Sequence, residues 1–360
     1  MTFCQDGGKL LSAFMKHTCN RIYPYVQNGR FYNYPNEIPE GFFFRSLYIY
    51  LKSHVNRLFY HPQTQDWIVK PNVPQRSIVP IITWIGHSTF LIQVAGFNII
   101  TDPIFGNATT LFPRILKPGL ELAQLPPIDY VLISHNHLDH MDAPALFVFK
   151  NDHPQCSYLV PLGDKKWFDE RGFSNVREYT WWQQDSFSLE NEHVTFTFLP
   201  AFHWSQRGMF DKNRSLWGSW MIDVGGKRIY FAGDTAYTRH FKVIGQEFDR
   251  IDCALMPIGP CEPHKWMKFS HANAKESYQG FLDLRAHHFI PMHWGTFYFG
   301  TDTFETSLKE LESVWNSLHQ DRLSQKRLHI MHVGQTMPLP TSQPPELEND
   351  QLVAGSVDAA

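Results

Sequence analysis

The sequence predicts an α/β fold in which two mixed β-sheets pack together and helices cover their outer faces. Short β-rich runs such as STFLIQV, DYVLIS and RIYFAG recur from Val79 onward. Ala95-Gly96 and Gly225-Gly226 are two-residue turns of the kind that close hairpins. Helical patterns separate the runs, at residues 143–149, 164–171, 271–285 and 304–318. A purely parallel sheet would not need the hairpins, so two packed mixed sheets are the better prediction.

We expect three parts along the chain. Residues 79–337 hold the two sheets, residues 1–78 form a partly helical N-terminal extension on or near the face that carries the site, and residues 338–360 form a disordered tail. Within the extension, apolar side chains recur at helical spacing between residues 44 and 59. We interpret this segment as a helix packed on the main domain. A basic amphipathic helix that touches a membrane surface is the alternative, and the sequence does not separate the two.

The composition argues against several classes of protein. The chain has 360 residues, of which 43% are hydrophobic, and this is enough for a large core. A formal net charge of -3 creates no general attraction for nucleic acid, so we expect no nucleic-acid partner. Five scattered cysteines without a CxxC pair argue for a reducing compartment. The N-terminus lacks the pattern of a signal peptide, and no apolar run has the length of a membrane span. We therefore expect a cytoplasmic protein, with peripheral membrane association as an open addition.

The run His135-Asn136-His137-Leu138-Asp139-His140 is the most informative part of the sequence. It follows the predicted strand DYVLIS and precedes a predicted helix, so it occupies a turn where alternate side chains converge. Imidazole and carboxylate are the usual zinc ligands outside thiolate sites. Structural zinc sites prefer closed sets with cysteine, and no cysteine is near this run. The pattern therefore favours a catalytic metal site.

Three further candidate ligands follow predicted strands elsewhere in the chain. They are His203 after HVTFTFLPAF, Asp234 after RIYFAG and His293 after HFIPM. Strand ends at one edge of a sheet bring such residues together. We predict two metal sites: His135, His137 and His203 form one, Asp139, His140 and His293 form the other, and the Asp234 carboxylate bridges them.

Several motifs, in this order, resemble the metallo-β-lactamase superfamily and, within it, the N-acylphosphatidylethanolamine-hydrolysing phospholipase D family. The segments lie between Val79 and Thr336 and include WIGHSTFLI, TDPIF, HNHLDHMD, LWGSW, FAGDTAY, MPIGPCEP, WMKFSHAN and HWGTF. HxHxDH alone is typical of the whole superfamily, whereas LWGSW, FAGDT and HWGTF are more specific. The resemblance implies an αββα sandwich and two zinc ions, and its ligand positions fall on the seven residues named above.

The resemblance also implies a reaction. Such enzymes hydrolyse N-acylphosphatidylethanolamine to N-acylethanolamine and phosphatidic acid, using a water that two metals activate. Asp139 would orient that water, and His271, which corresponds to a histidine of the family, is the candidate general acid. A structural role for His271 as a helix cap or a hydrogen-bond partner is the alternative. The substrate would be a phospholipid at a membrane surface, and a homodimer is a further hypothesis.

Other residues carry weaker hypotheses. Asp102 and His87 are either turn residues or hydrogen-bond partners of metal ligands. Tyr237 and His332 are candidates for contact with a phosphate. We expect the tryptophans at positions 181, 182, 217 and 220 to be core residues, and the apolar side chains at 42–44 and 111–112 to be exposed contacts for lipid.

Three rival functions remain at this point. One is hydrolysis of another phosphodiester or of a sugar-phosphate lactone, because one fold supports many reactions. A second is metal binding without catalysis, which all seven intact candidate ligands argue against. A third is nuclease activity, for which no basic patch is visible.

Overall fold

In the computed structural model, one half of the first sheet consists of antiparallel strands, and tight turns join most of them. The structure describes residues 21–33, 48, 49, 51–53, 55, 62–189, 192–318 and 326–339. At the β4–β5 turn, Ala95 and Gly96 have φ angles of 51° and 80°, the left-handed conformation that a type I′ hairpin turn requires. The seven strands, in spatial order, are β16 (Thr336–Pro338), β3 (Ile81–Gly86), β4 (Thr89–Val94), β5 (Phe97–Thr101), β6 (Tyr130–Leu132), β7 (Ser157–Pro161) and β8 (Val176–Tyr179).

The second sheet also has seven strands, and it repeats the same mixture of pairings. Its order is β15 (Arg327–Leu328), β14 (Ala286–Met292), β13 (Ile251–Pro257), β12 (Lys227–Phe231), β11 (Ser219–Val224), β10 (Glu192–Leu199) and β9 (Gln184–Leu189). Gly225 and Gly226 close the β11–β12 hairpin with φ angles of 59° and 81°. Strands β12 to β15 are parallel, as are β5 to β8 in the first sheet. Both predicted hairpins are therefore confirmed.

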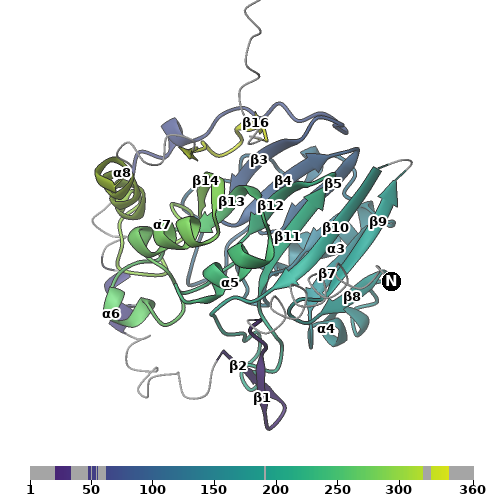
Figure 1. Ribbon diagram of the computed structural model, residues 1–360, viewed down its shortest axis with the longest axis horizontal. Helices are drawn as coiled ribbons and strands as arrows, with labels where there is room; N and C mark the ends of the chain where they lie inside the picture. Colours follow the sequence, from purple (N-terminus) through teal and green to yellow (C-terminus); the bar gives the residue numbers. More distant parts are fainter. Residues whose placement is uncertain are drawn as a thin grey trace, which may run out of the picture.

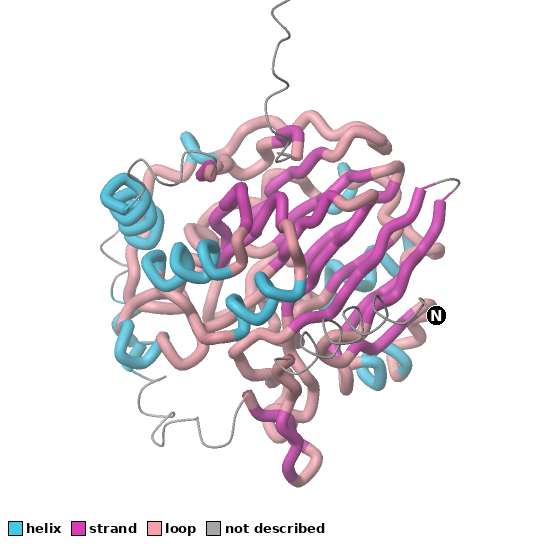
Figure 2. Tube along the Cα trace, viewed as in Figure 1, coloured by secondary structure: helices cyan, strands magenta, loops and turns pink. Residues whose placement is uncertain are grey.

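Helices cover the outer faces of both sheets, as predicted (Figures 1 and 2). Helix α7 packs on β13 and β14 and contacts α5 and α8, whereas α4 contacts β8 of the first sheet. Among the described residues from 62 onward, the α-helices are α3 (Ala143–Asp152), α4 (Lys165–Asp169), α5 (His240–Glu247), α6 (His264–Met267), α7 (Ala274–Asp283) and α8 (Thr306–Leu318), and two 3-10 turns are η1 (Gln65–Trp67) and η2 (Leu122–Gln124). Within the described residues, no helix has the length and apolar character needed to cross a membrane.

The apolar core lies in two layers because the first sheet is buried on both faces. Phe90 and Ile99 face the second sheet and belong to the large central cluster. Their neighbours Leu91 and Ile100 face the other way and pack with Phe149 of α3. This alternation follows from the two-residue period of a strand. The predicted tryptophan positions 181, 217 and 220 are buried in the central cluster, and Trp182 packs against it.

Some elements were not predicted. A short antiparallel hairpin, β1 (Tyr25–Gln27) and β2 (Arg30–Tyr32), lies in the N-terminal extension. Residues 48–49, 51–53 and 55 are helical, and the other residues of the predicted 44–59 helix lie outside the described residues. Strand β16 includes Pro338, the first residue of the predicted tail, and pairs it with Ile81. The division of the chain into three parts otherwise stays a prediction.

Candidate metal centre

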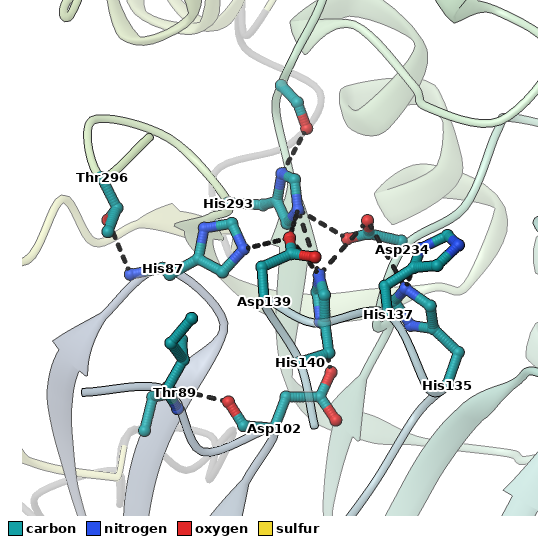
Figure 3. A network of polar contacts seen from close by, with 12 residues as sticks. His87, Thr89, Asp102, His135, His137, Asp139, His140, Asp234, His293 and Thr296 are labelled. Carbon is teal, nitrogen blue, oxygen red and sulfur yellow. Dashed lines mark hydrogen bonds and ion pairs between the residues drawn. The ribbon is translucent and has the colours of Figure 1, made fainter. Parts of the chain in front are cut away.

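The predicted ligands lie at the carboxyl ends of strands from both sheets. The turn after β6, residues 133–142, carries His135, His137, Asp139 and His140 and leads into α3. The other three ligands come from the second sheet: His203 follows β10, Asp234 follows β12 and His293 follows β14. Because strands β6, β10, β12 and β14 end at the same edge of the sandwich, all seven side chains meet there. Figure 3 labels each of them except His203.

His135, His137 and His203 form the first donor group. The His135 Nε2 atom lies 2.8 Å from His137 Nδ1, and His203 Nε2 lies 3.3 Å from the same atom. All three ring nitrogens therefore point at one small space, and these three residues form a set with the geometry to hold a metal ion.

Asp139, His140 and His293 form the second donor group. The Nε2 atoms of His140 and His293 are 3.2 Å apart, and Asp139 Oδ2 lies 3.2 Å from His140 Nε2. His87 lies beside this group, with its Nε2 3.0 Å from Asp139 Oδ2. These four residues form a second set with the geometry to hold a metal ion.

Asp234 lies between the two groups. Its Oδ1 is 3.0 Å from His293 Nε2, and its Oδ2 is 3.3 Å from His140 Nε2. The same Oδ2 is 3.8 Å from His203 Nε2 and 4.0 Å from His135 Nε2. One buried carboxylate thus faces the nitrogens of both groups, which is the arrangement of a bridging ligand.

Hydrogen bonds behind the rings fix which nitrogen of each imidazole faces inward. The Nδ1 atoms of His203 and His293 donate to the carbonyl oxygens of Ser270 and Gly259, at 2.9 Å and 2.8 Å. Because a carbonyl only accepts, each of these Nδ1 atoms carries a proton, and each Nε2 faces the centre, where it offers a lone pair whenever the ring is neutral.

The ligands of the first sheet are oriented by side chains instead. His140 Nδ1 donates to Asp102 Oδ2 at 2.7 Å, and His135 Nδ1 lies 2.9 Å from Ser134 Oγ. The Ser134 hydroxyl itself donates to the Asp102 carboxylate. Asp102 is therefore a hydrogen-bond partner of a candidate ligand, one of the two roles considered for it.

His87 is both a turn residue and a hydrogen-bond partner of a candidate ligand, the two roles considered for it. It sits in the β3–β4 turn with a φ of 54°, an uncommon value for a residue with a side chain. Its Nε2 donates to the Asp139 carboxylate, and its backbone N–H donates to Thr296 Oγ1 at 2.9 Å. The strained turn aims the His87 ring at the second donor group.

Burial and charge set the protonation of the centre. Burial lowers the pKa of His203 to about 3 and that of His137 to about 4, so both rings are neutral at pH 7. Burial also lowers the pKa of His293, but the carboxylates of Asp234 and Asp139 outweigh it and raise that pKa to about 9. The carboxylates thus give the second group a strong preference for positive charge.

A cavity with a volume of about 440 Å³ opens onto this centre. His137, Asp139, Asp234 and His293 form its polar floor, and His271 lies on its wall. His271 Nδ1 is 3.7 Å from Asp234 Oδ2, and burial lowers the pKa of His271 to about 3. The remaining lining residues are Ala108, Thr109, Phe112, Leu138, Trp204, Gln206, Arg207, Gly208 and Phe299.

Two residues near the centre were missed by the sequence analysis. Arg207 lines the cavity and donates to the carbonyl oxygens of Asn136 and Met141, at 3.3 Å and 2.7 Å. Asn33 makes two hydrogen bonds with the backbone of His203, at 2.7 Å and 3.1 Å. Neither residue belongs to a motif. Arg207 could have been noticed because it lies four residues after His203, whereas no sequence signal marks Asn33.

Two weaker candidates lie away from the centre. The Tyr237 hydroxyl donates to Asp283 Oδ2 at 2.8 Å, and the Tyr237 ring stacks on Phe241. The His332 ring stacks on Trp67, with 4.9 Å between the centroids. Tyr237 and His332 are not among the residues that line the cavity. Of the proposed lipid contacts, Leu111 is exposed and Phe112 lines the cavity, whereas residues 42–44 lie outside the described residues.

Fold and donor set together define a metal-dependent hydrolase of the metallo-β-lactamase fold. A family model described as the beta-lactamase superfamily domain matches residues 97–294, more than half of the chain. The chain belongs to this superfamily, and the predicted fold class is confirmed.

Within the superfamily, the chain is similar to phospholipases of type D. It is 36% identical over 244 residues to the N-acyl-phosphatidylethanolamine-hydrolyzing phospholipase D 1 of Caenorhabditis elegans, a match that covers 64% of this chain and 68% of the relative. It is 35% identical over 240 residues to the mitochondrial enzyme of that name from Saccharomyces cerevisiae, of which the match spans only 51%.

A solved structure agrees with the fold. The metallo hydrolase Igni18 of the archaeon Ignicoccus hospitalis superposes with a TM-score of 0.54 at 21% identity, covering 72% of this chain and 97% of Igni18. At this identity the likeness supports the fold alone.

Proposed function

We propose that the chain is a binuclear-metal phosphodiesterase that hydrolyses N-acylphosphatidylethanolamine to N-acylethanolamine and phosphatidic acid. The observation that carries the proposal is the pair of three-residue donor groups that share Asp234 between them. His135, His137 and His203 would hold one ion, Asp139, His140 and His293 would hold the other, and the Asp234 carboxylate would bridge the two.

The donor set fits divalent cations. The Nε2 atoms of His203 and His293 face inward because carbonyl groups hold their Nδ1 atoms, and His137 Nδ1 lies 2.8 Å from His135 Nε2 in the same space. The facing nitrogens of the neutral His137 and His203 rings are 3.3 Å apart, and two lone pairs at that distance repel one another unless a proton or a cation lies between them. Nitrogen and carboxylate donors without thiolate favour zinc, although other divalent metals fit the same ligands.

The side chains around the ions have distinct tasks. When bound, a pair of divalent ions lowers the pKa of a shared water from ~15.7 towards ~7 and neutralises phosphate charge. The Asp139 carboxylate accepts a hydrogen bond from the nucleophilic water, which directs a lone pair at phosphorus. Arg207 adds positive charge to the cavity wall.

His271 is placed to serve the leaving group. The bond from phosphorus to the N-acylethanolamine oxygen breaks, and that oxygen must gain a proton. His271 lines the cavity with its Nδ1 3.7 Å from Asp234 Oδ2, and a phosphodiester anion bound beside it would favour its protonated form. His271 therefore donates the proton to the departing oxygen.

The choice of substrate rests on the similarity to the two phospholipases D and on the lining of the cavity. Phe112, Leu138, Trp204 and Phe299 place apolar surface next to the polar floor, as a substrate with a phosphate and acyl chains requires. The substrate partner in this proposal is a phospholipid at a membrane surface. A homodimer and a cytoplasmic location stay predictions.

Product analysis tests the proposal. Purified protein with zinc is incubated with N-acylphosphatidylethanolamine in water enriched in oxygen-18. Attack at phosphorus predicts N-acylethanolamine without label and phosphatidic acid with one labelled oxygen. Treatment with a chelator should abolish turnover, and added zinc should restore it. Release of free fatty acid would contradict the cleavage position, and turnover of a soluble lactone in place of the lipid would favour the rival function.

A further inference from the structure

The β1–β2 hairpin and the loop after His203 lie side by side. The backbone N–H of Phe31 donates to the Asn213 carbonyl oxygen at 2.8 Å. The Arg30 guanidinium donates to the carbonyl oxygens of Lys212 and Phe210. Figure 1 shows the hairpin as a projection from the body of the sandwich, and Figure 2 shows its two short strands at the end of that projection. Hairpin and loop thus form one continuous surface.

This surface exposes large apolar side chains. Met209 and Phe210 at the tip of the loop are 81% and 79% exposed, and Tyr25 and Val26 of β1 are 43% and 54% exposed. We call these four residues the apolar rim. Clustered exposed apolar side chains of this size mark a site of interaction more often than an isolated exposed residue does.

The loop is held in place by its own hydrogen bonds. The Asp211 carboxylate accepts from the backbone N–H groups of Gly208 and Arg207, at 2.8 Å and 3.2 Å. The Asn213 N–H donates to the Ser205 carbonyl at 2.7 Å. Met209 and Phe210 are therefore displayed by a defined turn, which reduces the entropy lost when they are buried against a partner.

The rim adjoins the mouth of the cavity. Gly208, next to Met209 in the chain, lines the cavity together with Arg207. On another part of the lining, Leu138 is itself exposed, and Thr109 and Phe112 flank the exposed Leu111. Exposed apolar side chains thus come from three segments that line the cavity.

Positive charge accompanies the apolar surface. Arg30, Lys212 and Arg214 all belong to the hairpin or the loop, whereas the one carboxylate between residues 204 and 214, Asp211, is bound to backbone N–H groups. Arg214 is exposed and Arg30 and Lys212 are partly exposed. Apolar tips with cationic side chains in the same segments match the layers of an anionic bilayer, where acyl chains lie beneath negatively charged headgroups.

We propose that the apolar rim docks the enzyme on the surface of an anionic phospholipid bilayer, with Met209 and Phe210 inserted among the acyl chains. Docking places the mouth of the cavity against the membrane, so that a lipid headgroup reaches Asp139 and His271 without leaving the bilayer entirely. The use of this surface for catalysis rests on the proposed function, but the docking itself does not require turnover.

Vesicle flotation tests the docking with the full chain. The vesicles contain phosphatidylcholine with or without about one third phosphatidylglycerol and lack N-acylphosphatidylethanolamine. The Met209→Ser/Phe210→Ser double variant should bind anionic vesicles at least roughly tenfold more weakly than the parent, because two large apolar side chains no longer insert. The parent should bind neutral vesicles more weakly and lose binding as salt is raised.

A matched control is available. Ile78 and Val79 are 78% and 65% exposed, and they lie beside the Ala95-Gly96 turn, at the opposite end of β4 from His87. The Ile78→Ser/Val79→Ser variant should bind vesicles like the parent. Absence of binding by the parent, or an equal loss in both double variants, would overturn the proposal.

Two further measurements separate this inference from the function. If neither a water-soluble short-chain N-acylphosphatidylethanolamine nor the vesicle form is hydrolysed while the rim still governs vesicle binding, the proposed reaction fails and the docking stands. Hydrolysis of the soluble form by the rim variant at the parental rate, with slower hydrolysis in vesicles, supports both. A dimer in sedimentation that Phe210→Ser dissociates, with vesicle binding unchanged, would instead assign the rim to a second copy of the chain.

Discussion

The two sheets supply the candidate metal centre in different ways. From the first sheet come four donors within one turn, His135 to His140, and the side chains of Asp102 and Ser134 orient two of them. From the second sheet come three donors on three separate strands, and backbone carbonyls orient two of these. The hydrogen bonds that orient His135 and His140 can therefore be removed by substituting a side chain. Those that orient His203 and His293 cannot, because their acceptors are backbone carbonyl groups. We expect the first sheet to be where the properties of the metals are tuned.

Asp234→Asn should have the largest effect, because this residue of the second sheet faces both donor groups. An amide lacks the negative charge that offsets two cations, and we expect kcat/KM to fall by roughly 10³-fold or more. Metal analysis should show the loss of bound zinc, while circular dichroism shows an intact fold. Full metal content with full activity would mean that Asp234 does not bridge.

His137→Ala and His203→Ala remove one ligand of the same group, one from each sheet. Both variants should lose binding of one ion, with similar losses of activity of roughly 10²-fold, because the group needs all three nitrogens. Titration of the metal-free proteins with zinc measures this. If only one of the two variants lost zinc binding, the two sheets would not contribute equally to this donor group, and the shared site would be contradicted.

His271→Gln should keep both ions and lower kcat by roughly 10²-fold, as expected for loss of a general acid. The sharper measurement compares two substrates. A phosphodiester with a nitrophenolate leaving group needs no proton at that oxygen, so it should lose far less activity than the lipid. Equal losses with both substrates would assign His271 to positioning.

Asp102→Asn tests the tuning by the first sheet. The amide weakens the bond to His140 Nδ1 and should lower metal affinity by about 10-fold. Asp129→Asn is the control, since this carboxylate also lies beside the first sheet and binds Arg76 and the Asn98 N–H, away from the centre. Competition with a chromogenic chelator measures the difference, which should be absent in the control.

Tyr237→Phe should have the smallest effect. Its hydroxyl donates to Asp283 outside the cavity, so kcat/KM should stay within about two-fold of the parent, and stability should fall by about 1 kcal/mol. Urea denaturation and steady-state kinetics measure both. A large loss of activity would return Tyr237 to the list of phosphate contacts.

Much of the fold was predictable where strands were long and apolar. The hairpins closed by Ala95-Gly96 and Gly225-Gly226 were identified because only a few residue types adopt the left-handed turn. The β1–β2 hairpin was overlooked although Asn28-Gly29 is such a turn, because strands of three residues carry no measurable period. Strand β9 was missed for another reason: QDSFSL is polar and largely exposed at the edge of its sheet.

By itself the sequence determined which residues are the candidate metal ligands, because histidine and aspartate at this spacing in a turn after a strand are typical of metal sites. Only the tertiary structure decided which nitrogens face inward, since the carbonyls of Gly259 and Ser270 that fix them leave no trace in side-chain identity. It also decided that Asn33, distant in the chain, holds the backbone of His203, and that Met209 and Phe210 stand exposed beside the cavity. Such features depend on how segments far apart in the chain pack against one another, and a local pattern does not encode that packing.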